Sequence, residues 1–245
     1  MESFSSEEGS IIVSNLIEAI QDNKQYLSDL DGMVGDGDHG INMNKGATLC
    51  AEALEKNPGN LAHFLEVLSK TLMGAIGGAM GPLYGMFFQG MAKACEGKDT
   101  IDSLTFEEML KSGEAGIRDV SEAKVGDKTM MDTLIPAITA YSTALRSGRD
   151  FIESLAAMRA AAIAGRDSTK DLIAKLGRSS RLGERSRGVL DAGAVSLCLI
   201  LESMADSIRS LIRQDSTICI STGNQSITKN SDSETAGHDS MTKEI

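Results

Sequence analysis

Residues 61–76 read LAHFLEVLSKTLMGAI, and the large apolar side chains in this stretch recur at steps of three and four residues. This spacing is typical of an α-helix with one apolar face. The residues that share the face are Leu61, Phe64, Leu65, Leu68 and Leu72. Because such a face must be covered by another element, the stretch predicts a helix packed against other helices.

The rest of the chain repeats this pattern on both sides of residues 61–76. Only three prolines interrupt the 245 residues, and the period-two alternation typical of strands is hard to find. Two pairs at capping-box spacing, Ser5 with Glu8 and Thr105 with Glu108, predict helix starts. The expected helices cover residues 8–27, 41–56, 61–76, a stretch that opens at Pro82, 105–120, 129–147, 150–175 and 190–213. Seven or eight helices joined by short glycine-containing loops predict an all-α bundle with antiparallel neighbours.

Domain organisation follows from a change in composition near the C-terminus. Residues 1–213 carry the helical pattern and are long enough to form one domain with a sizeable core. From residue 214 the chain is rich in Ser, Thr and Asn and poor in large apolar side chains. This composition is typical of a disordered segment, so we expect residues 214–245 to form a polar tail.

Charge and cysteine content narrow the classes of function. The chain has 24 basic and 35 acidic residues and a net charge of -11, which disfavours binding to nucleic acid or to an anionic membrane surface. The four cysteines form no CxxC pair and have no histidine at zinc-ligand spacing, so we interpret them as thiols of a reducing compartment. The polar start, MESFSSEEGS, and the lack of a long apolar run predict a cytoplasmic protein.

Acidic residues and glycines crowd residues 29–46, DLDGMVGDGDHGINMNKG, between two helical patterns. The glycines satisfy the GxGxxG pattern of a dinucleotide site, but that site needs a preceding strand, which the pattern lacks. A calcium-binding EF-hand starting at Asp36 fails because Ile41 and Ala47 stand where glycine and a bidentate glutamate are required. An ordinary turn stays open, because Asp-Gly pairs are common turn formers, although three aspartates within eight residues weaken that interpretation.

A magnesium site explains both residue types in this loop. Asp31, Asp36 and Asp38 would repel one another unless cations compensate them, and Mg²⁺ takes carboxylate oxygens together with phosphate oxygens. The glycines allow close approach of a ligand, and the helix after them would offer its N-terminal amides to an anion. Side-chain donors at this helix start are His39, Asn42 and Asn44. The loop therefore predicts a metal site that also binds phosphate.

Three further segments fit a phosphate site, and each also has a plainer interpretation. Residues 74–85, GAIGGAMGPLYG, allow either close helix packing or a set of backbone amides for phosphate. Residues 125–137 place Lys and Thr at a helix start, followed by two methionines that would usually belong to a core. Residues 177–194 concentrate arginines, which form either a solvated face or a basic patch for phosphoryl transfer. From the first two segments we expect Gly78 and Thr129 at the site.

Together these segments resemble, in order and spacing, the DhaL-type nucleotide-binding subunit of dihydroxyacetone kinases over about residues 8–206. The matching stretches are Asp31 with GDGDHGINMNKG, then GGAMGPLYG, GDKTMMD, GRSSRLGERSRG and DAGA. The resemblance implies a barrel of about eight antiparallel helices with ADP or ATP bound at one end. It also implies that Asp31, Asp36 and Asp38 hold two magnesium ions that bridge the nucleotide phosphates. A conventional P-loop is excluded, because no GxxxxGK[ST] is present.

We expect Arg178 to assist phosphoryl transfer, because a guanidinium beside the terminal phosphoryl group interacts more strongly as charge shifts in the transition state. The resemblance implies that a separate DhaK-like subunit binds the ketose, most simply dihydroxyacetone, through a histidine. The nucleotide contacts that the resemblance implies are His39, Gly40, Ile41, Asn42, Ala79, Met80, Met130, Arg178, Asp191, Ala192 and Gly193. Two phosphoryl donors stay open: free ATP, or a phosphohistidine protein of a phosphotransferase system that recharges bound ADP. The alternative function is another role of the family, a nucleotide-sensing module that binds a transcription factor.

Three residues depart from the family pattern. Met80 stands where the family commonly has serine, Ala192 where it commonly has proline, and Gly37 where alanine is frequent. None of these changes removes a carboxylate of the predicted metal site. The His-Gly pair after Asp38 argues against the related fatty-acid-kinase branch, whose pattern differs at this point. We therefore expect a kinase subunit that binds nucleotide and does not phosphorylate a free ketose alone.

Overall fold

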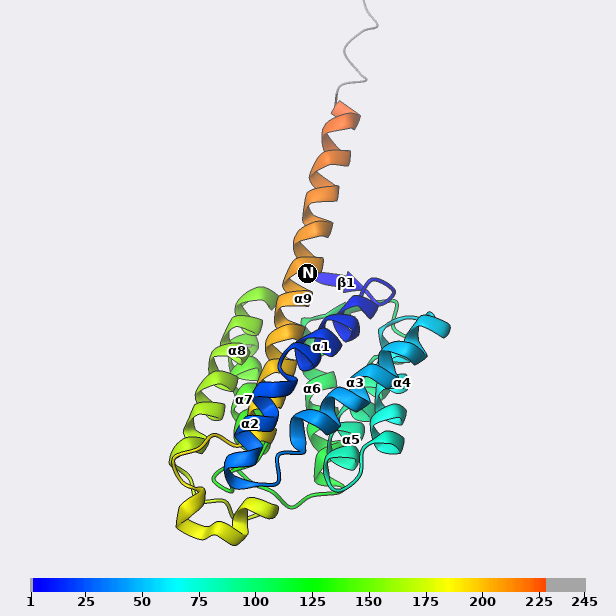
Figure 1. Ribbon diagram of the computed structural model, residues 1–245. Coiled ribbons are helices and arrows are strands. Elements are labelled where there is room, and N and C mark those ends of the chain that lie inside the picture. The colour runs from blue at the N-terminus through cyan, green and yellow to red at the C-terminus, as the bar shows by residue number, and fades with distance from the viewer. Residues whose placement is uncertain (1, 228–245) are drawn as a thin grey trace, which may run out of the picture. The chain divides into compact units, whose positions relative to one another are not determined.

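The computed structural model describes residues 2–227, with side chains for residues 2–214. The chain divides into a compact unit, Met1–Ile212, and a second unit, Arg213–Ile245. The described part of the first unit is mostly helical (Figure 1). The predicted all-α class is therefore confirmed.

Nine α-helices, one pair of short strands and two 3₁₀ segments make up the described residues. The α-helices are α1 Ser10–Asp22, α2 Lys24–Val34, α3 His39–Lys56, α4 Leu61–Ala75, α5 Met80–Cys95, α6 Ser103–Arg118, α7 Met131–Arg146, α8 Phe151–Ser168 and α9 Ala192–Ile227. The strands are β1 Ser3–Ser5 and β2 Thr100–Asp102, and the 3₁₀ segments are η1 Thr169–Asp171 and η2 Arg178–Ser186.

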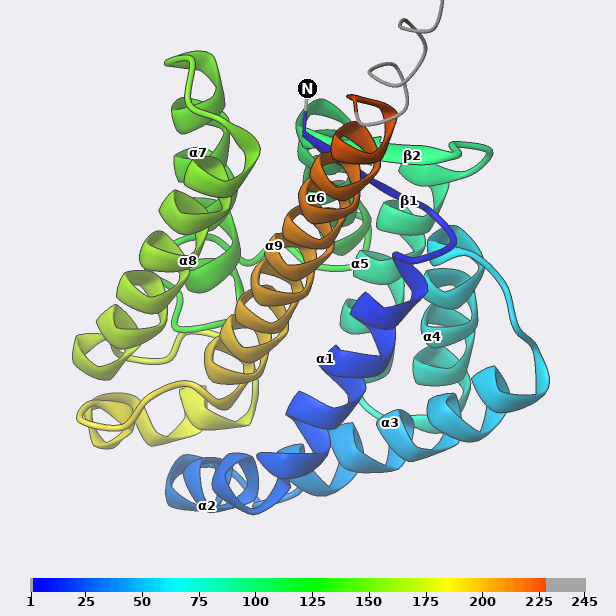
Figure 2. The ribbon, with the colours of Figure 1, turned by 90° about the horizontal axis from the view of Figure 1, so that it is seen from above.

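The first part of α9, up to Ile212, forms the centre of the compact unit. In Figure 2 it runs between the α7–α8 pair and α1. Its polar groups are bonded to four other helices, α1, α5, α7 and α8, through the pairs Asn15–Ser207, Tyr84–Ser196, Thr133–Ala194 and Arg159–Glu202. Its apolar residues Leu197, Leu201 and Ile208 are fully buried. The core therefore forms around one helix whose N-terminal end begins at the site described below.

The first predicted helix, residues 8–27, is in fact two helices. α1 ends at Asp22 and α2 begins at Lys24, with Asn23 between them. The Asn23 side chain donates a hydrogen bond to the carbonyl of Ala19 at 2.8 Å, a local bond that competes with continuation of the helix. This break turns the chain so that α2 leads into the aspartate loop, and Asp31 lies within α2 rather than in the loop.

Both predicted capping boxes are wrong. Ser5 belongs to β1, and α1 starts after Gly9 without a side-chain cap. Asp102 caps α6 instead, because its carboxylate accepts a hydrogen bond from the Thr105 amide at 2.8 Å. A capping box does form at the start of α8, between Asp150 and Glu153. A carboxylate at these sites serves as well as a hydroxyl, so the spacing alone did not select the right pair.

The two short strands were not expected from the pattern. β1 and β2 pair antiparallel and place Phe4 opposite Ile101, and both side chains are buried. The Glu2 carboxylate next to β1 accepts a hydrogen bond from the Phe151 amide at 3.0 Å, at the start of α8. Three-residue strands are too short to produce a period that sequence reading can detect.

The predicted tail, residues 214–245, falls partly on α9, which continues to Ile227. Residues 228–245 lie outside the described residues, so the expected disorder of the tail stays a prediction. Cys50, Cys95 and Cys198 are buried and form no disulfide. Among the described residues, no helix combines the length and apolar character that crossing a membrane would require.

Candidate functional site

A cavity of about 650 Å³ opens where α2 meets α3 and where α5, α7 and α9 begin. All of the predicted site residues line this cavity except Gly40, Ile41 and Asn44. The structure therefore brings together the aspartate loop, the glycine segment, the start of α7, Arg178 and the DAGA stretch, which are widely separated in the sequence.

Asp31, Asp36 and Asp38 form an aspartate cluster in one wall of the cavity. One carboxylate oxygen from each residue lies within 4.8 Å of the others. Asp31 is in the last turn of α2, Asp36 follows that helix, and Asp38 directly precedes α3. Gly37, between the two loop aspartates, has a φ of 77°, a backbone conformation that favours glycine. The turn thus forces three like charges together.

Arg178 is a cation that reaches the aspartate cluster. Its guanidinium forms an ion pair with Asp36 and lies 3.4 Å from a carboxylate oxygen of Asp38. Three carboxylates facing one guanidinium leave excess negative charge, which a divalent cation would neutralise. The ligands are hard oxygens on a partly exposed surface, which suits Mg²⁺ with its retained waters and phosphate oxygens. The residues present therefore fit the predicted metal.

His39, the first residue of α3, is buried behind the cluster, with 7% of its surface exposed. Burial lowers the pKa of His39 to about 4, although the nearby Asp31 carboxylate opposes this change. The ring is therefore neutral near pH 7. Its Nε2 lies 2.8 Å from Ser196 Oγ, and Ser196 Oγ lies 2.6 Å from the Tyr84 hydroxyl. Helices α3, α5 and α9 are thus connected by one buried hydrogen-bonded row.

The glycine segment also lines the cavity. Gly77 and Gly78 have no atoms within 4 Å of the position a Cβ would occupy, and Gly78 has a φ of 69°. The bare backbone leads into Ala79 and Met80 at the start of α5. Unpaired amides at a helix start attract phosphate, so Met80 needs only its backbone amide to take part.

Asp191 and Lys128 lie on the third side of the cavity. Asp191 precedes α9, and its carboxylate accepts a hydrogen bond from the Ala194 amide at 2.8 Å. Burial raises the pKa of Asp191 to about 6, while that hydrogen bond and the Lys128 ammonium oppose the increase. Burial also lowers the pKa of Lys128, and Asp191 is the first of three carboxylates that oppose this change.

Three predicted contacts lie away from the cavity wall. Gly40 packs against α2, where an added Cβ would meet the Lys24 carbonyl oxygen at 2.0 Å. Ile41 points outward and is 55% exposed. Asn44 is half-buried one turn further along α3. The resemblance placed Gly40 and Ile41 at the nucleotide, but the local role that the structure shows for Gly40 is helix packing.

Sequence reading missed most of the apolar wall. The cavity is also lined by Leu83, Tyr84, Ile117, Ala123, Met131 and Leu176. Leu83 and Tyr84 follow Met80 by three and four residues, so helical spacing could have predicted that they share its face. Ile117 and Leu176 come from the end of α6 and from the loop before η2, and no local pattern marks them.

The comparison with known families identifies the family of this chain. The DAK2 domain matches residues 33–206, which is more than half of the chain. The chain belongs to the DAK2-domain family. A DAK2-family relative from Listeria innocua, named as the ADP-binding subunit DhaL of a PEP-dependent dihydroxyacetone kinase, is 39% identical over 188 residues, or 76% of this chain and 89% of the relative. The subunit of that name from Escherichia coli is 33% identical and covers 74% of this chain and 87% of its own length.

This chain is similar to solved structures of the dihydroxyacetone kinase of C. freundii. Its native form has a TM-score of 0.63 and 28% identity over 81% of this chain. The match covers 34% of that kinase, so this chain spans about a third of its length. A second structure of the same kinase, in complex with AMP-PNP and Mg²⁺, has a TM-score of 0.58 at 25% identity. The predicted resemblance is therefore confirmed.

Proposed function

We propose that this chain is the nucleotide-binding subunit of a dihydroxyacetone-type kinase. It would transfer a phosphoryl group from a magnesium-bound nucleotide to a small ketose that a separate subunit holds. The observation that carries the proposal is the aspartate cluster facing Arg178 at one wall of a cavity of about 650 Å³. That volume is within the range of small-molecule sites. The names of the relatives, ADP-binding subunits of dihydroxyacetone kinases, support it.

The residues of the cavity have separate tasks in this proposal. Asp31, Asp36 and Asp38 would hold the magnesium, which neutralises phosphate charge when bound. Arg178 lies against two of these carboxylates. It would stabilise the negative charge that develops on the leaving oxygen during transfer. The backbone from Gly78 to Met80 would donate to phosphate. His39 is neutral and fixed by Ser196, so it would contribute a hydrogen bond rather than a charge.

We infer that the phosphoryl donor is a phosphohistidine protein that recharges bound ADP. This choice is supported by the names of two relatives, which are PEP-dependent and PTS-dependent. The alternative donor is free ATP, which would have to exchange at every turnover. The rate at which bound ADP exchanges with labelled ADP in solution distinguishes the two donors. A subunit that is recharged by a phosphoprotein keeps its nucleotide, whereas an ATP-dependent enzyme exchanges it within a turnover.

The ketose would be held by a DhaK-like partner. The cavity offers carboxylates, a guanidinium and apolar side chains, which suit a nucleotide and its metal better than a small polyol. In the C. freundii kinase, the matched region is 34% of the chain, and the rest of that kinase lies outside the match. In-line transfer needs the acceptor hydroxyl next to the phosphoryl group, so the partner should cover the cavity mouth.

A reconstituted assay with dihydroxyacetone tests the proposal. We expect the purified chain with Mg²⁺ and nucleotide to turn over no ketose alone, and to become active when a ketose-binding kinase subunit from the same source is added. Robust turnover by the lone chain would contradict the divided site. If the chain binds no ADP by calorimetry in the presence of Mg²⁺, the nucleotide-binding function itself is wrong.

A further inference from the structure

Lys128 is a buried lysine in the turn between α6 and α7, and the tasks assigned above do not include it. Only 2% of its surface is exposed. Its φ is 61°, and among the described residues no other non-glycine residue has a positive φ. Such a conformation is unfavourable for a residue with a long side chain, and strain of this kind is often found where position matters for function.

The Lys128 ammonium joins two distant points of the backbone. It donates one hydrogen bond to the carbonyl of Thr169 and one to the carbonyl of Val189, each at 2.5 Å. These two residues flank residues 170–188, which leave the end of α8 and return to the start of α9. We call residues 170–188 the arginine segment; it is the yellow excursion in Figure 1. Its two ends are also joined by a bond of 2.7 Å from the Gly188 amide to the Lys170 carbonyl.

The arginine segment carries Arg178, and its backbone turns at three glycines. Glycines with positive φ stand at positions 177, 183 and 188. The side chain of Arg178 is 58% exposed, so little packing fixes it. The placement of Arg178 against the aspartate cluster therefore depends on how firmly the segment is anchored at its ends.

The turn that holds Lys128 is itself fixed to α7. Asp132, in the first turn of that helix, accepts hydrogen bonds from the Gly126 amide at 2.5 Å and the Thr129 amide at 2.8 Å. The neighbouring Asp127 accepts a hydrogen bond at 3.0 Å from the side chain of Lys175, which belongs to the arginine segment. A continuous set of hydrogen bonds thus leads from α7 through the turn to the segment that carries Arg178.

We propose that Lys128 is a positioning residue for phosphoryl transfer, because it holds both ends of the arginine segment together and thereby keeps Arg178 against Asp36 and Asp38. We call its two hydrogen bonds, to Thr169 and Val189, the clasp. A lysine suits this task, since its ammonium has three donors on a long stem and can satisfy two carbonyls at once. The kinetic part of the inference rests on the proposed function, whereas the structural part does not.

Limited proteolysis tests the structural part without any assay of activity. Lys128→Met keeps the length of the side chain and removes its donors. Lys124→Met, at an exposed lysine of the same turn, is the matched control. An arginine-specific protease should cut the arginine segment about tenfold faster in Lys128→Met than in the wild type, because cleavage follows the open population of the segment. The control should be cut at the wild-type rate.

A double-mutant cycle with Arg178→Ala tests the kinetic part in the reconstituted kinase. Lys128→Met should lower kcat about tenfold, while the Kd for ADP with Mg²⁺ changes by less than about threefold. In the Arg178→Ala background, Lys128→Met should cause little further loss of kcat. A residue that merely supported the fold would lower activity by the same factor in both backgrounds. Lys128→Arg, which retains donors, should recover part of the wild-type rate.

Each contrary result has a definite meaning. Unchanged cleavage of the arginine segment in folded Lys128→Met overturns the clasp, whatever the kinase assay shows. If Lys128→Met lowers kcat by the same factor with and without Arg178→Ala, Lys128 does not act through Arg178. If both Lys128→Met and the milder Lys128→Gln fail to fold, Lys128 supports the whole unit, and the proposal is also wrong. If the reconstituted wild type is inactive but the segment opens in Lys128→Met, the proposed function fails and the clasp stands.

Discussion

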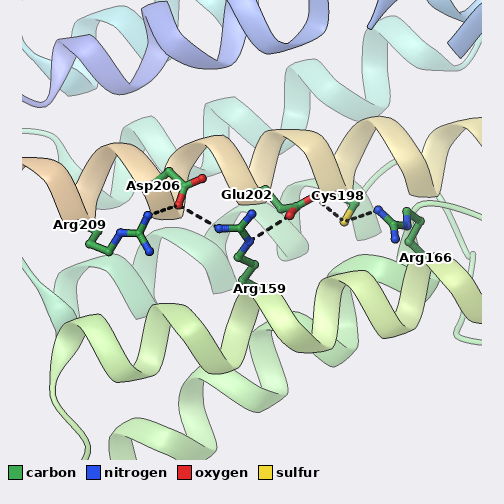
Figure 3. Close-up of polar contacts among 6 residues, drawn as sticks. All are labelled: Arg159, Arg166, Cys198, Glu202, Asp206 and Arg209. Atoms are coloured by element: carbon green, nitrogen blue, oxygen red, sulfur yellow. Dashed lines mark hydrogen bonds and ion pairs between the residues drawn. The ribbon is translucent and has the colours of Figure 1, made fainter. Parts of the chain in front are cut away.

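Two arginines of this protein each contact two carboxylates, and they do so in contrasting surroundings. Arg159 on α8 lies 3.0 Å from Glu202 and 3.0 Å from Asp206, which are one turn apart on α9 (Figure 3). Arg209 also contacts Asp206, at 2.9 Å. We call Arg159, Glu202, Asp206 and Arg209 the helix bridge. Arg178, in contrast, is in the 3₁₀ segment η2, outside the α-helices, and faces the aspartate cluster.

The difference between the two groups is one of charge balance and of support. In the helix bridge, Arg159 and Arg209 match two carboxylates, and all four groups are on regular helices. In the aspartate cluster, three carboxylates face one guanidinium. A balanced bridge between helices contributes to stability and needs no ligand. An unbalanced cluster at a cavity wall is destabilising without a cation, which is typical of a binding site.

The largest expected effect is on nucleotide affinity, which should depend on the aspartate cluster and not on the helix bridge. Asp38→Asn removes one metal ligand while keeping the shape of the side chain, so the affinity for ADP with Mg²⁺ should fall at least about tenfold, or ~1.4 kcal/mol. Asp206→Asn in the helix bridge is the matched control and should leave this affinity unchanged. Calorimetry with and without EDTA measures both. Equal affinities for Asp38→Asn and the wild type would remove the metal assignment.

A smaller effect is expected from replacing the arginine beside the aspartate cluster with lysine. Arg178→Lys keeps the charge but loses the planar fork, so turnover in the reconstituted kinase should fall by about tenfold while nucleotide affinity changes less. Separate measurements of kcat and of the Kd for ADP in the wild type and the variant test this. Full turnover in the lysine variant would show that Arg178 contributes only general positive charge.

The pH dependence of stability tests whether folding shifts the pKa values of His39 and Asp191 in opposite directions. The pKa of His39 is lowered from 6.5 to about 4, so its contribution to stability is present above pH 6.5 and is lost as the pH falls towards 4. The pKa of Asp191 is raised from 3.8 to about 6, so its contribution is present below pH 3.8 and is lost as the pH rises through 6. The two trends oppose each other between pH 4 and 6.

Asp191→Asn removes one of these two trends. Without magnesium, this variant should lose about 1 to 2 kcal/mol more stability than the wild type when the pH falls from 6 to 4. Denaturant unfolding of the wild type and the variant at both pH values measures the difference. Parallel stability curves for Asp191→Asn and the wild type would show that the Asp191 carboxyl is ordinary.

The smallest effect is expected from the helix bridge. Arg159→Met should lower the free energy of unfolding by about 0.5 to 1 kcal/mol, and less at high salt, because the side chains are partly exposed. Nucleotide affinity should stay at the wild-type value. A loss of nucleotide affinity in this variant would mean that the two groups are coupled through α9, and the distinction between them would fail.

Local patterns predicted the fold well because its helices have clear apolar faces. The helix at residues 61–76 was predicted almost to the residue, since α4 covers Leu61–Ala75. The break at Asn23 was missed because the apolar spacing continues through it, and a single side-chain bond to Ala19 decides it. The pairing of β1 with β2 depends on strands about a hundred residues apart, which a local pattern cannot reveal.

The candidate site was predictable where its chemistry is concentrated in the sequence. The three aspartates lie within eight residues of the chain, and the structure places their oxygens together. The bonding partners of Tyr84 and Lys128 could not be predicted from local patterns, because Ser196, Thr169 and Val189 are far away in the sequence. Gly40 is in the motif, but its lack of a side chain lets α3 pack closely on α2. A motif can therefore include residues that serve packing rather than ligand binding. The ligand contacts themselves stay predictions.

The buried thiols make the arginine segment open to spectroscopic labelling. Burial raises the pKa of Cys50 and Cys198 to about 12 and that of Cys95 to about 11, so maleimide reagents should leave these three unmodified near pH 7. The side chain of Cys219 lies outside the described residues, and Cys219→Ser removes it from consideration. A fluorophore on Arg181→Cys in that background would occupy an exposed position of the arginine segment. Its anisotropy would then report nanosecond motion of the segment as nucleotide arrives.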